Sequence, residues 1–511
     1  MRKVILQRCL IVFFALALAC IPVLTVVFRK VPKLETEYEV KQLDKNVKTT
    51  IKVLAPNGNE DRAFIENLAK EFKKYYPNVT IKYDPLSGDL NSMLTGFYNS
   101  EKSNPGTMPD IFLTDAFSMN KFADEGIVLN LDSLITVAEN EEVGENTFEL
   151  NKAFGAFDAS EYYETYWKLG QKDYNGSQIL VPRSLDTVVT HYNKAMVNEA
   201  NTWLINNGKP GISSKIKNGW TWQDFLDVCQ GIREYWDSNE MGKQSLYLVD
   251  AYLDWEANWN AIFESFGVKY YDAENDIDCA LDSQETRDAL TLIKDVVEKR
   301  YVAPFNKTQA NFEGGQGVML FHSKSAQQTI DNLYEIYKNE IGAGKKYSSM
   351  NEIYDVVTFP LIGDNPKIGS GVAGYCIFSG CAGNGRGKFN KEVSWEFLRL
   401  MLAKDGQNIM ADSGLTYTPI RKDMADTTNQ ENKWAYSLRQ QGFNMSAYVY
   451  YLEKPECFTA TTFTAYEKYP SKASASLVSA VQNMVAEYVN GKSFSKVFGD
   501  VEADFDYYIN L

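Results

Sequence analysis

The sequence predicts an α/β fold in which mainly parallel sheets are flanked by helices. Three observations lead to this prediction: β-branched segments alternate with segments of helical periodicity, clusters of Gly, Pro and Asn separate them, and no internal repeat stands out. A strand–helix–strand order brings successive strands back in the same direction, which favours parallel pairing. The chain has 511 residues, 44% of them hydrophobic, so it exceeds one typical core and suggests two bodies.

A strand–helix–strand–helix–strand pattern opens the folded part of the chain. Residues 49–54, TTIKVL, are predicted to form a β-branched strand, and a turn cluster follows them. Apolar residues then recur at helical spacing over residues 64–75, and Pro77 ends this helix. The next strands are expected at 79–83 and 110–113, with an amphipathic stretch between them.

A second set of strands and helices follows further along the chain. Residues 179–182 lead into an extended segment at 186–193, and a helix is expected over residues 221–235. The glycine-rich turn within residues 314–321 leads into a short strand, and residues 356–360 form another. These segments are predicted to build the second body.

The N-terminus indicates the compartment. Residues 9–28 are an unbroken apolar run with basic residues on both sides, and about 20 apolar residues suffice to span a bilayer as a helix. Residues 17–19, ALA, resemble a cleavage site before Cys20, so lipidation at Cys20 is the alternative. Residues 21–28 stay apolar where a mature lipoprotein turns polar, so we favour an uncleaved signal anchor. In both interpretations the acidic remainder lies on the outer face of the cell membrane.

Charge and composition argue against several functional classes. The formal net charge is -15 and no basic block occurs, which argues against nucleic-acid binding. The chain has 2 histidines, His191 and His322, so we expect neither a metal site nor catalysis by imidazole groups. Residues 314–317, GGQG, lack the lysine of a phosphate-binding loop, so we expect no nucleotide or other cofactor.

Two further motifs have alternative interpretations. Cys376 and Cys381 are close enough in sequence for a disulfide, and buried thiols are the alternative. Residues 272–278, DAENDID, suggest a calcium loop, but they lack the glycine and glutamate that an EF-hand requires. A hairpin is therefore expected there.

Five stretches occur in an order that is hard to obtain by chance. They are LAKEF and YPNV within 68–79, PDIF and ADEGIVLNL within 109–131, VP and YNK within 181–194, WTWQDF at 220–225, and FL, G and TPIR within 397–421. Together they resemble the bacterial extracellular solute-binding family that includes the maltose-binding protein, over nearly all of the chain after residue 48. The resemblance implies a two-lobed, type II periplasmic-binding-protein-like fold that encloses a ligand between its lobes.

The resemblance also implies the boundaries of the lobes. It places the strand crossings near residues 184–186, 369–374 and 424–433. The expected parts are a signal anchor at 1–30, a tether at 31–47, a first lobe at 48–184 plus 371–425, and a second lobe at 185–370 plus 426–511.

Sugars present hydroxyl groups around the ring and C–H patches on its faces, so carboxylates, amides and aromatic rings are the expected contacts. The resemblance implies a hydroxyl acceptor at Asp115, a sugar-binding carboxylate at Asp186 and an aromatic ring at Tyr375. Helix capping is the alternative for Asp115, and an ion pair is the alternative for Asp186. In the first loop, Asn57 and Glu60 are candidates because ligands bind beyond the carboxyl ends of parallel strands.

The remaining candidates are aromatic or basic residues, and a structural role is the alternative for each. Trp255 and Trp259 lie one helical turn apart, where stacking on a sugar competes with packing in the core. The other candidates are Phe117 after the third strand, Phe321 and His322 after the glycine-rich turn, and Tyr417 and Arg421 near the last crossing, with a structural salt bridge as the alternative for Arg421.

The resemblance implies a function in transport. The chain would be the extracellular component of an ABC importer that captures a carbohydrate, most simply an oligosaccharide, and delivers it to the membrane permease subunits. It would act as a monomer, and ligand-driven closure of the lobes would replace catalysis. One alternative is a ligand sensor for a membrane kinase. The other is a glycoside-processing enzyme, which would need two carboxylates across the groove.

Overall fold

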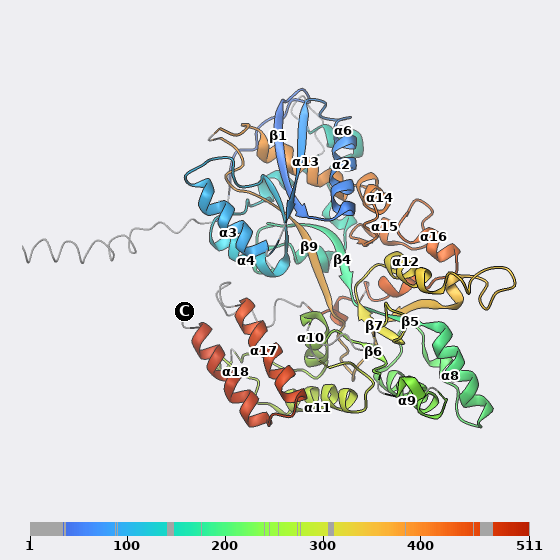
Figure 1. Ribbon diagram of the computed structural model, residues 1–511. Helices are drawn as coiled ribbons and strands as arrows, with labels where there is room; N and C mark the ends of the chain where they lie inside the picture. The colour runs from blue at the N-terminus through green and yellow to red at the C-terminus, as the bar shows by residue number, and fades with distance from the viewer. Residues whose placement is uncertain are drawn as a thin grey trace, which may run out of the picture.

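The computed structural model forms two lobes, each built on one β-sheet with helices packed against it (Figure 1). β4 and β9 run from one lobe toward the other, so the lobes are connected by strands as well as by loops. The structure describes residues 34, 37–86, 88, 90–140, 148–174, 176–239, 241–244, 246–253, 255–272, 274–275, 277–304, 311–383, 385–452, 454–459 and 474–509.

The first lobe contains a six-stranded mixed sheet in the order β10-β4-β9-β3-β1-β2. β1 is parallel to β2 and β3, whereas β9 is antiparallel to β3 and β4, and β10 is antiparallel to β4. The strands are β1 (Thr49–Pro56), β2 (Val79–Leu86), β3 (Ile111–Asp115), β4 (Val181–Thr187), β9 (Ser370–Ile377) and β10 (Thr418–Pro419).

The second lobe contains a four-stranded sheet in the order β6-β7-β5-β8. β6 and β7 are parallel, and β5 is antiparallel to both β7 and β8. The strands are β5 (Val189–Asn193), β6 (Val249–Asp250), β7 (Met319–His322) and β8 (Tyr354–Thr358).

The α/β class and the two lobes are confirmed, but the prediction of mainly parallel sheets is wrong. The antiparallel pairs involve the strands that connect the lobes, because β4 leaves the first sheet and β9 re-enters it. A strand–helix alternation predicts parallel neighbours only while the chain stays within one lobe. The connecting strands follow a different path, and their hydrophobic pattern carries no information on direction.

Helices cover both sheets, and their bounds are as follows. Those of the N-terminal part are α2 (Asn59–Phe72), α3 (Leu90–Glu101), α4 (Ala116–Asp124), α5 (Asp132–Ala138), α6 (Glu149–Phe154), η1 (Ala159–Glu161), α7 (Glu164–Lys168) and η2 (Lys172–Tyr174). The middle holds α8 (Lys194–Asn206), η3 (Ser213–Lys215), α9 (Trp222–Asn239), η4 (Met241–Lys243), α10 (Glu256–Ser265), α11 (Gln284–Glu298), α12 (Ala326–Tyr337) and η5 (Met350–Glu352). The C-terminal part holds α13 (Asn390–Leu402), α14 (Lys404–Asp412), α15 (Lys422–Ala425), α16 (Tyr436–Gln440), η6 (Met445–Tyr448), η7 (Pro455–Cys457), α17 (Ser474–Val489) and α18 (Phe494–Ile509).

Several helices begin at polar caps that the sequence places directly after strands or turns. Asp115 accepts a hydrogen bond from the Ser118 backbone N–H at 2.7 Å, and Asn193 accepts one from the Met196 N–H at 3.0 Å. Such caps satisfy amide groups that have no partner within the helix. Because each cap ends a strand, it also fixes where the next helix leaves the sheet.

The first crossing lies at Val188, slightly later than the sequence indicated. Leu185, Asp186 and Thr187 still pair with β9 in the first sheet, although we assigned residues 185–187 to the second lobe. Val188 donates its N–H to the Gly369 carbonyl at 2.9 Å, so the outgoing and returning strands are bonded at the crossing.

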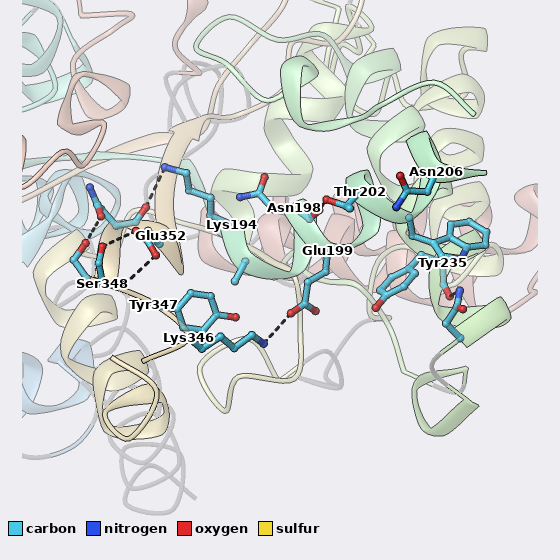
Figure 2. Close-up of a pocket in the computed structure, with 15 residues that line it drawn as sticks. Lys194, Asn198, Glu199, Thr202, Asn206, Tyr235, Lys346, Tyr347, Ser348 and Glu352 are labelled. Atoms are coloured by element: carbon cyan, nitrogen blue, oxygen red, sulfur yellow. Dashed lines mark hydrogen bonds and ion pairs between the residues drawn. The ribbon is translucent and has the colours of Figure 1, made fainter. Parts of the chain in front are cut away.

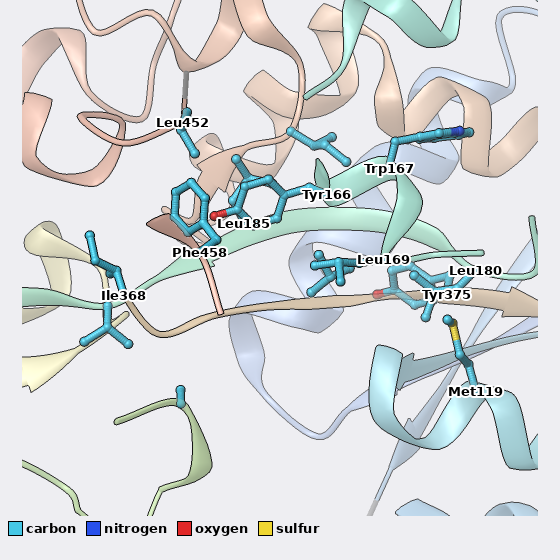
Figure 3. Close-up of a cluster of buried hydrophobic side chains, with 14 of the residues drawn as sticks. Met119, Tyr166, Trp167, Leu169, Leu180, Leu185, Ile368, Tyr375, Leu452 and Phe458 are labelled. Atoms are coloured by element: carbon cyan, nitrogen blue, oxygen red, sulfur yellow. The ribbon is translucent and has the colours of Figure 1, made fainter. Parts of the chain in front are cut away.

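A third segment, residues 457–459, joins these two strands at the crossing. Ile368 donates its N–H to the Cys457 carbonyl at 2.7 Å and accepts the Thr459 N–H at 3.0 Å. Phe458 packs edge-on against Tyr166 of the first lobe, with ring centroids 5.4 Å apart (Figure 3). The resemblance did not reveal this segment, because it lies within a stretch longer than the shorter family members have.

The cysteine pair and the acidic segment at 272–278 have the simpler of the two structures that the sequence allowed. Cys376 and Cys381 are free and buried, so no disulfide forms between them. Asp272 and Ile277 exchange two backbone hydrogen bonds of 2.9 Å, which confirms the hairpin. The predicted anchor and Cys20 lie outside the described residues; within the described chain, no helix has the length and apolar character needed to cross a membrane.

Candidate functional site

Two surfaces of the lobes approach each other beside the crossing strands. The first-lobe face consists of Asp115, Asp186, Arg183 and Tyr417. The second-lobe face consists of Tyr252, Trp255, Glu256 and His322. The hydroxyl groups of Ser325, three residues after His322, and Thr416, next to Tyr417, are hydrogen-bonded to each other, so the two faces meet at this point.

Asp115 stands at the carboxyl end of β3, where the sequence predicted a ligand contact. Its side chain is exposed and caps α4 through one oxygen. The capping alternative is therefore confirmed. A carboxylate that accepts an amide through one oxygen can still accept hydroxyl groups, because its two oxygens offer about four lone pairs.

Arg183 is the central charge of the first-lobe face, and the sequence analysis missed it. It lies on β4 with only 5% of its surface exposed, and its Nη1 is 3.3 Å from Asp61 Oδ1. Its guanidinium lies over the Tyr417 ring, 4.7 Å from the centroid. A buried cation needs such partners, because leaving water is costly for an unpaired charge.

Asp186 and Tyr375 lie within the electrostatic reach of the same guanidinium. Burial raises the pKa of Asp186 to about 6, and the positive charge of Arg183 opposes this rise. Burial likewise raises the pKa of Tyr375 to about 12, again opposed by Arg183. The structure thus brings together three predicted residues, Asp186, Tyr375 and Tyr417, around a cation that was not predicted.

The second-lobe face is aromatic. The rings of Trp255 and His322 have centroids 5.1 Å apart at an interplanar angle of 32°, and Tyr252 packs edge-on against His322 at 5.4 Å. Tyr252 has a φ of 44°, which is uncommon for a residue with a bulky side chain. Trp255 occupies the position before α10 without a side-chain capping hydrogen bond and stays partly exposed, so this aromatic cluster lies at the surface of the lobe.

His322 is neutral at physiological pH. Burial lowers its pKa to about 4, and the nearby Lys324 ammonium adds to this effect. Its Nδ1 accepts the Lys324 backbone N–H at 3.0 Å, so the neutral ring carries its proton on Nε2. The ring therefore provides one N–H donor in addition to its aromatic face.

Glu256 follows Trp255 and brings a carboxylate to the second-lobe face. Burial raises the pKa of Glu256 well above its ordinary value, and the negative charges of Asp115 and Glu264 raise it further. Glu256 of the second lobe thus lies within the electrostatic reach of Asp115 of the first lobe. The sequence analysis missed Glu256, although its place beside the predicted Trp255 was a usable signal.

Three predicted aromatic contacts are wrong, because the side chains are buried. Trp259 is 2% exposed and packs against Phe263 and Tyr270, because the helical turn that separates it from Trp255 carries it into the lobe. Phe321 is 1% exposed because alternate residues of β7 point to opposite sides, so only His322 reaches the face. Tyr375 is also buried, which excludes stacking of its ring on a ligand.

The other candidates have different surroundings. Asn57 and Glu60 are exposed around the start of α2, close to Asp61. Arg421 forms ion pairs with Glu161 at 2.5 Å and with Asp423 at 2.8 Å, which confirms its structural alternative. The side chain of Phe117 lies outside the described residues. Among the described residues, no group of His, Cys, Asp and Glu side chains could hold a metal ion.

Comparisons with known proteins identify the family and the fold. A family model described as a bacterial extracellular solute-binding protein matches residues 67–437. A search of the curated proteins finds no match to the sequence. The solved structures, in contrast, include many proteins with the same fold.

Three similar solved structures cover 91% of this chain and 99% of their own chains. The GacH receptor of Streptomyces glaucescens, solved unliganded and with acarbose, has a TM-score of 0.62 at 15% identity. The ABC substrate-binding protein Lmo0181 from Listeria monocytogenes, in complex with cycloalternan, has a TM-score of 0.60 at 16% identity. UgpB from Mycobacterium tuberculosis, in complex with glycerophosphocholine, has a TM-score of 0.61 at 15% identity. At these identities the likeness establishes the fold and leaves the ligand to the residues of the site.

Proposed function

We propose, from the premise that this chain belongs to the bacterial extracellular solute-binding proteins, that it captures a carbohydrate between its lobes and delivers it to an ABC permease. One observation supports this most directly: an aromatic face on one lobe meets a carboxylate-bearing face on the other. Aromatic rings cover the C–H patches of a sugar, and carboxylates accept its hydroxyl groups. The similar structures with acarbose and cycloalternan contain ligands of this class.

Each face contributes a separate part of the recognition. Trp255, supported by His322, would stack against a sugar ring, while the Nε2–H of His322 would donate to a hydroxyl oxygen. Asp115 and Asp186 would accept hydroxyl groups from the first lobe. Arg183 would keep the side chains of Asp186 and Tyr417 in position. Its own guanidinium is held by the ion pair with Asp61 and lies over the Tyr417 ring.

The charges across the faces suggest how ligand binding would couple to closure. Burial and the negative charge of Asp115 raise the pKa of Glu256, so its uncharged carboxyl form is favoured. A sugar hydroxyl group could then accept a hydrogen bond from Glu256 while another donates one to Asp115, which would draw the two lobes together. Closure would then present both lobes to the permease, with the N-terminal anchor holding the protein at the outer face of the membrane.

Calorimetric titration with a defined panel tests this proposal. The panel contains maltose, maltotriose, cellotriose, mannotriose and raffinose, with glycerophosphocholine as the probe that is not a sugar. We expect at least one saccharide to bind, and Trp255→Ala to weaken its binding by about 30-fold, a loss of about 2 kcal/mol typical of a buried tryptophan anchor.

The exposed Tyr334→Ala on α12 is the matched aromatic control and should bind as the parent does. Chromatography of the recovered saccharide should show it intact. Binding of glycerophosphocholine alone, or full affinity in Trp255→Ala, would contradict a carbohydrate site. Release of cleaved product would favour the glycoside-processing enzyme instead, which needs two carboxylates across the groove.

A further inference from the structure

The second lobe carries a groove that shares no residue with either facing surface. The groove has a volume of about 1040 Å³ and lies between α8, the last turns of α9 and the segment at 346–352 (Figure 2). In Figure 1, α8 lies at the outer edge of the second lobe, on the side away from β1 and β2. A ligand here would therefore not compete with one between the lobes.

The charged side chains around the groove are paired with one another or with backbone groups. Lys346 Nζ is 2.9 Å from Glu199 Oε1, and Lys194 Nζ donates to the Asn351 carbonyl at 3.0 Å. Glu352 accepts hydrogen bonds from the N–H and the hydroxyl group of Ser348, at 3.1 and 2.6 Å. A groove with balanced charges, in a protein of net charge -15, favours a neutral ligand.

One side of α8 presents a row of polar side chains to the groove. Asn198, Thr202 and Asn206 are spaced four residues apart, so they lie along one face of the helix, and all three are exposed. The side-chain amides of Asn198 and Asn206 form no hydrogen bond with any residue that the structure describes. The Thr202 hydroxyl donates to the backbone carbonyl of Asn198 at 2.8 Å. Each amide thus offers a donor and an acceptor, the pair that sugar hydroxyl groups require.

Aromatic rings border the same row. Trp203 and Tyr235 form a tilted pair with centroids 5.9 Å apart, and both are partly exposed. Tyr347 lines the opposite wall, where its neighbour Lys346 reaches across to Glu199 (Figure 2). Aromatic surface beside amides and paired charges fits a polyhydroxylated ligand better than a protein partner, for which a larger apolar patch would be expected.

We propose that this groove is a second binding site for a neutral polysaccharide chain, held on the outside of the lobe. The amides of Asn198 and Asn206 bind its hydroxyl groups, and the rings of Trp203, Tyr235 and Tyr347 contact its sugar faces. Such a site would keep a long glycan near the membrane while shorter pieces bind between the lobes. The proposal does not depend on the ligand between the lobes.

Native electrophoresis through gels that contain a polysaccharide tests this site. The full chain would be run in gels with amylopectin, pullulan, galactomannan or mixed-linkage β-glucan, and in a gel without polysaccharide. We expect retardation in at least one of these gels. The double variant Asn198→Ala/Asn206→Ala should weaken the interaction by about tenfold, because it removes two exposed hydrogen-bonding groups.

Three comparisons decide whether the retardation comes from this groove. Asn104→Ala, an exposed asparagine of the first lobe, is the matched control and should migrate as the parent does. Trp255→Ala should keep the retardation, because its ring lies between the lobes. Absence of retardation in all four gels overturns the proposal. So does retardation that Trp255→Ala abolishes and the double variant retains. Equal melting temperatures of the variants and the parent show that folding is not the cause.

Discussion

The two facing surfaces of the lobes are organised by different kinds of side chain. The first-lobe face is organised by a buried ion pair, Arg183 with Asp61, and the second-lobe face by an aromatic cluster of Trp255, His322 and Tyr252. Arg183 and Asp186 of the first-lobe face lie on β4 of the six-stranded sheet. The rings of the second-lobe face lie near the ends of β6 and β7 and the start of α10. The comparison teaches that positions fixed by a sheet can hold a buried charge, whereas positions at loops suit rings that stay partly exposed.

The comparison predicts that the free energy of unfolding depends far more on single residues of the first-lobe face than on single residues of the second-lobe face. Arg183→Met should lower the free energy of unfolding by about 3–5 kcal/mol, because Asp61 and Asp186 would lose their buried cation. Urea denaturation of the two proteins measures this. Arg287→Met is the control: its ion pair with Asp282 is largely exposed, and removing it should cost less than about 1 kcal/mol. A loss of similar size in both variants would show that Arg183 does not organise the face.

A smaller effect is expected from the titration of Asp186. Its pKa is about 6 in the folded protein and near 4 when unfolded, so its proton stabilises the folded state below pH 4. This contribution is lost as the pH rises through 6, by at most about 3 kcal/mol. Asp186→Asn cannot titrate, so its free energy of unfolding should fall less than that of the parent between pH 4 and pH 7. Parallel urea titrations at four pH values compare the slopes, and identical slopes would contradict the raised pKa.

The smallest effect is expected for Glu256, which brings a carboxyl group to the aromatic second-lobe face. Glu256→Gln mimics the uncharged carboxyl that the raised pKa favours, so saccharide affinity should change by less than about threefold at neutral pH, as measured by calorimetry. Glu264→Gln on the same helix is the control, because its side chain already accepts a hydrogen bond from Asn260 at 3.0 Å. A larger loss of affinity in Glu256→Gln would instead show that the charged carboxylate contacts the ligand.

The candidate site shows which kinds of residue a sequence reveals. Asp115 and Asp186 were candidates through the family resemblance, which places a carboxylate at the end of one strand and another on a crossing strand, and the structure has Asp115 at the end of β3 and Asp186 on β4. Trp255 and Trp259 were indistinguishable by spacing, yet the first lies just before α10 at the surface and the second lies in the core. Arg183 was missed because the value of a buried charge depends on Asp61, which is 122 residues away in the chain.

Sequence patterns were enough for the α/β class and the positions of most strands along the chain, because periodicity and turn residues act over a few neighbours, whereas the two lobes followed from chain length and the family resemblance. Tertiary structure alone decided the antiparallel pairing of β4 with β9, the crossing at Val188 and the contact of Ser325 with Thr416. These features depend on contacts between residues that are distant in the chain, and local patterns carry no record of which distant segment a strand or side chain will meet.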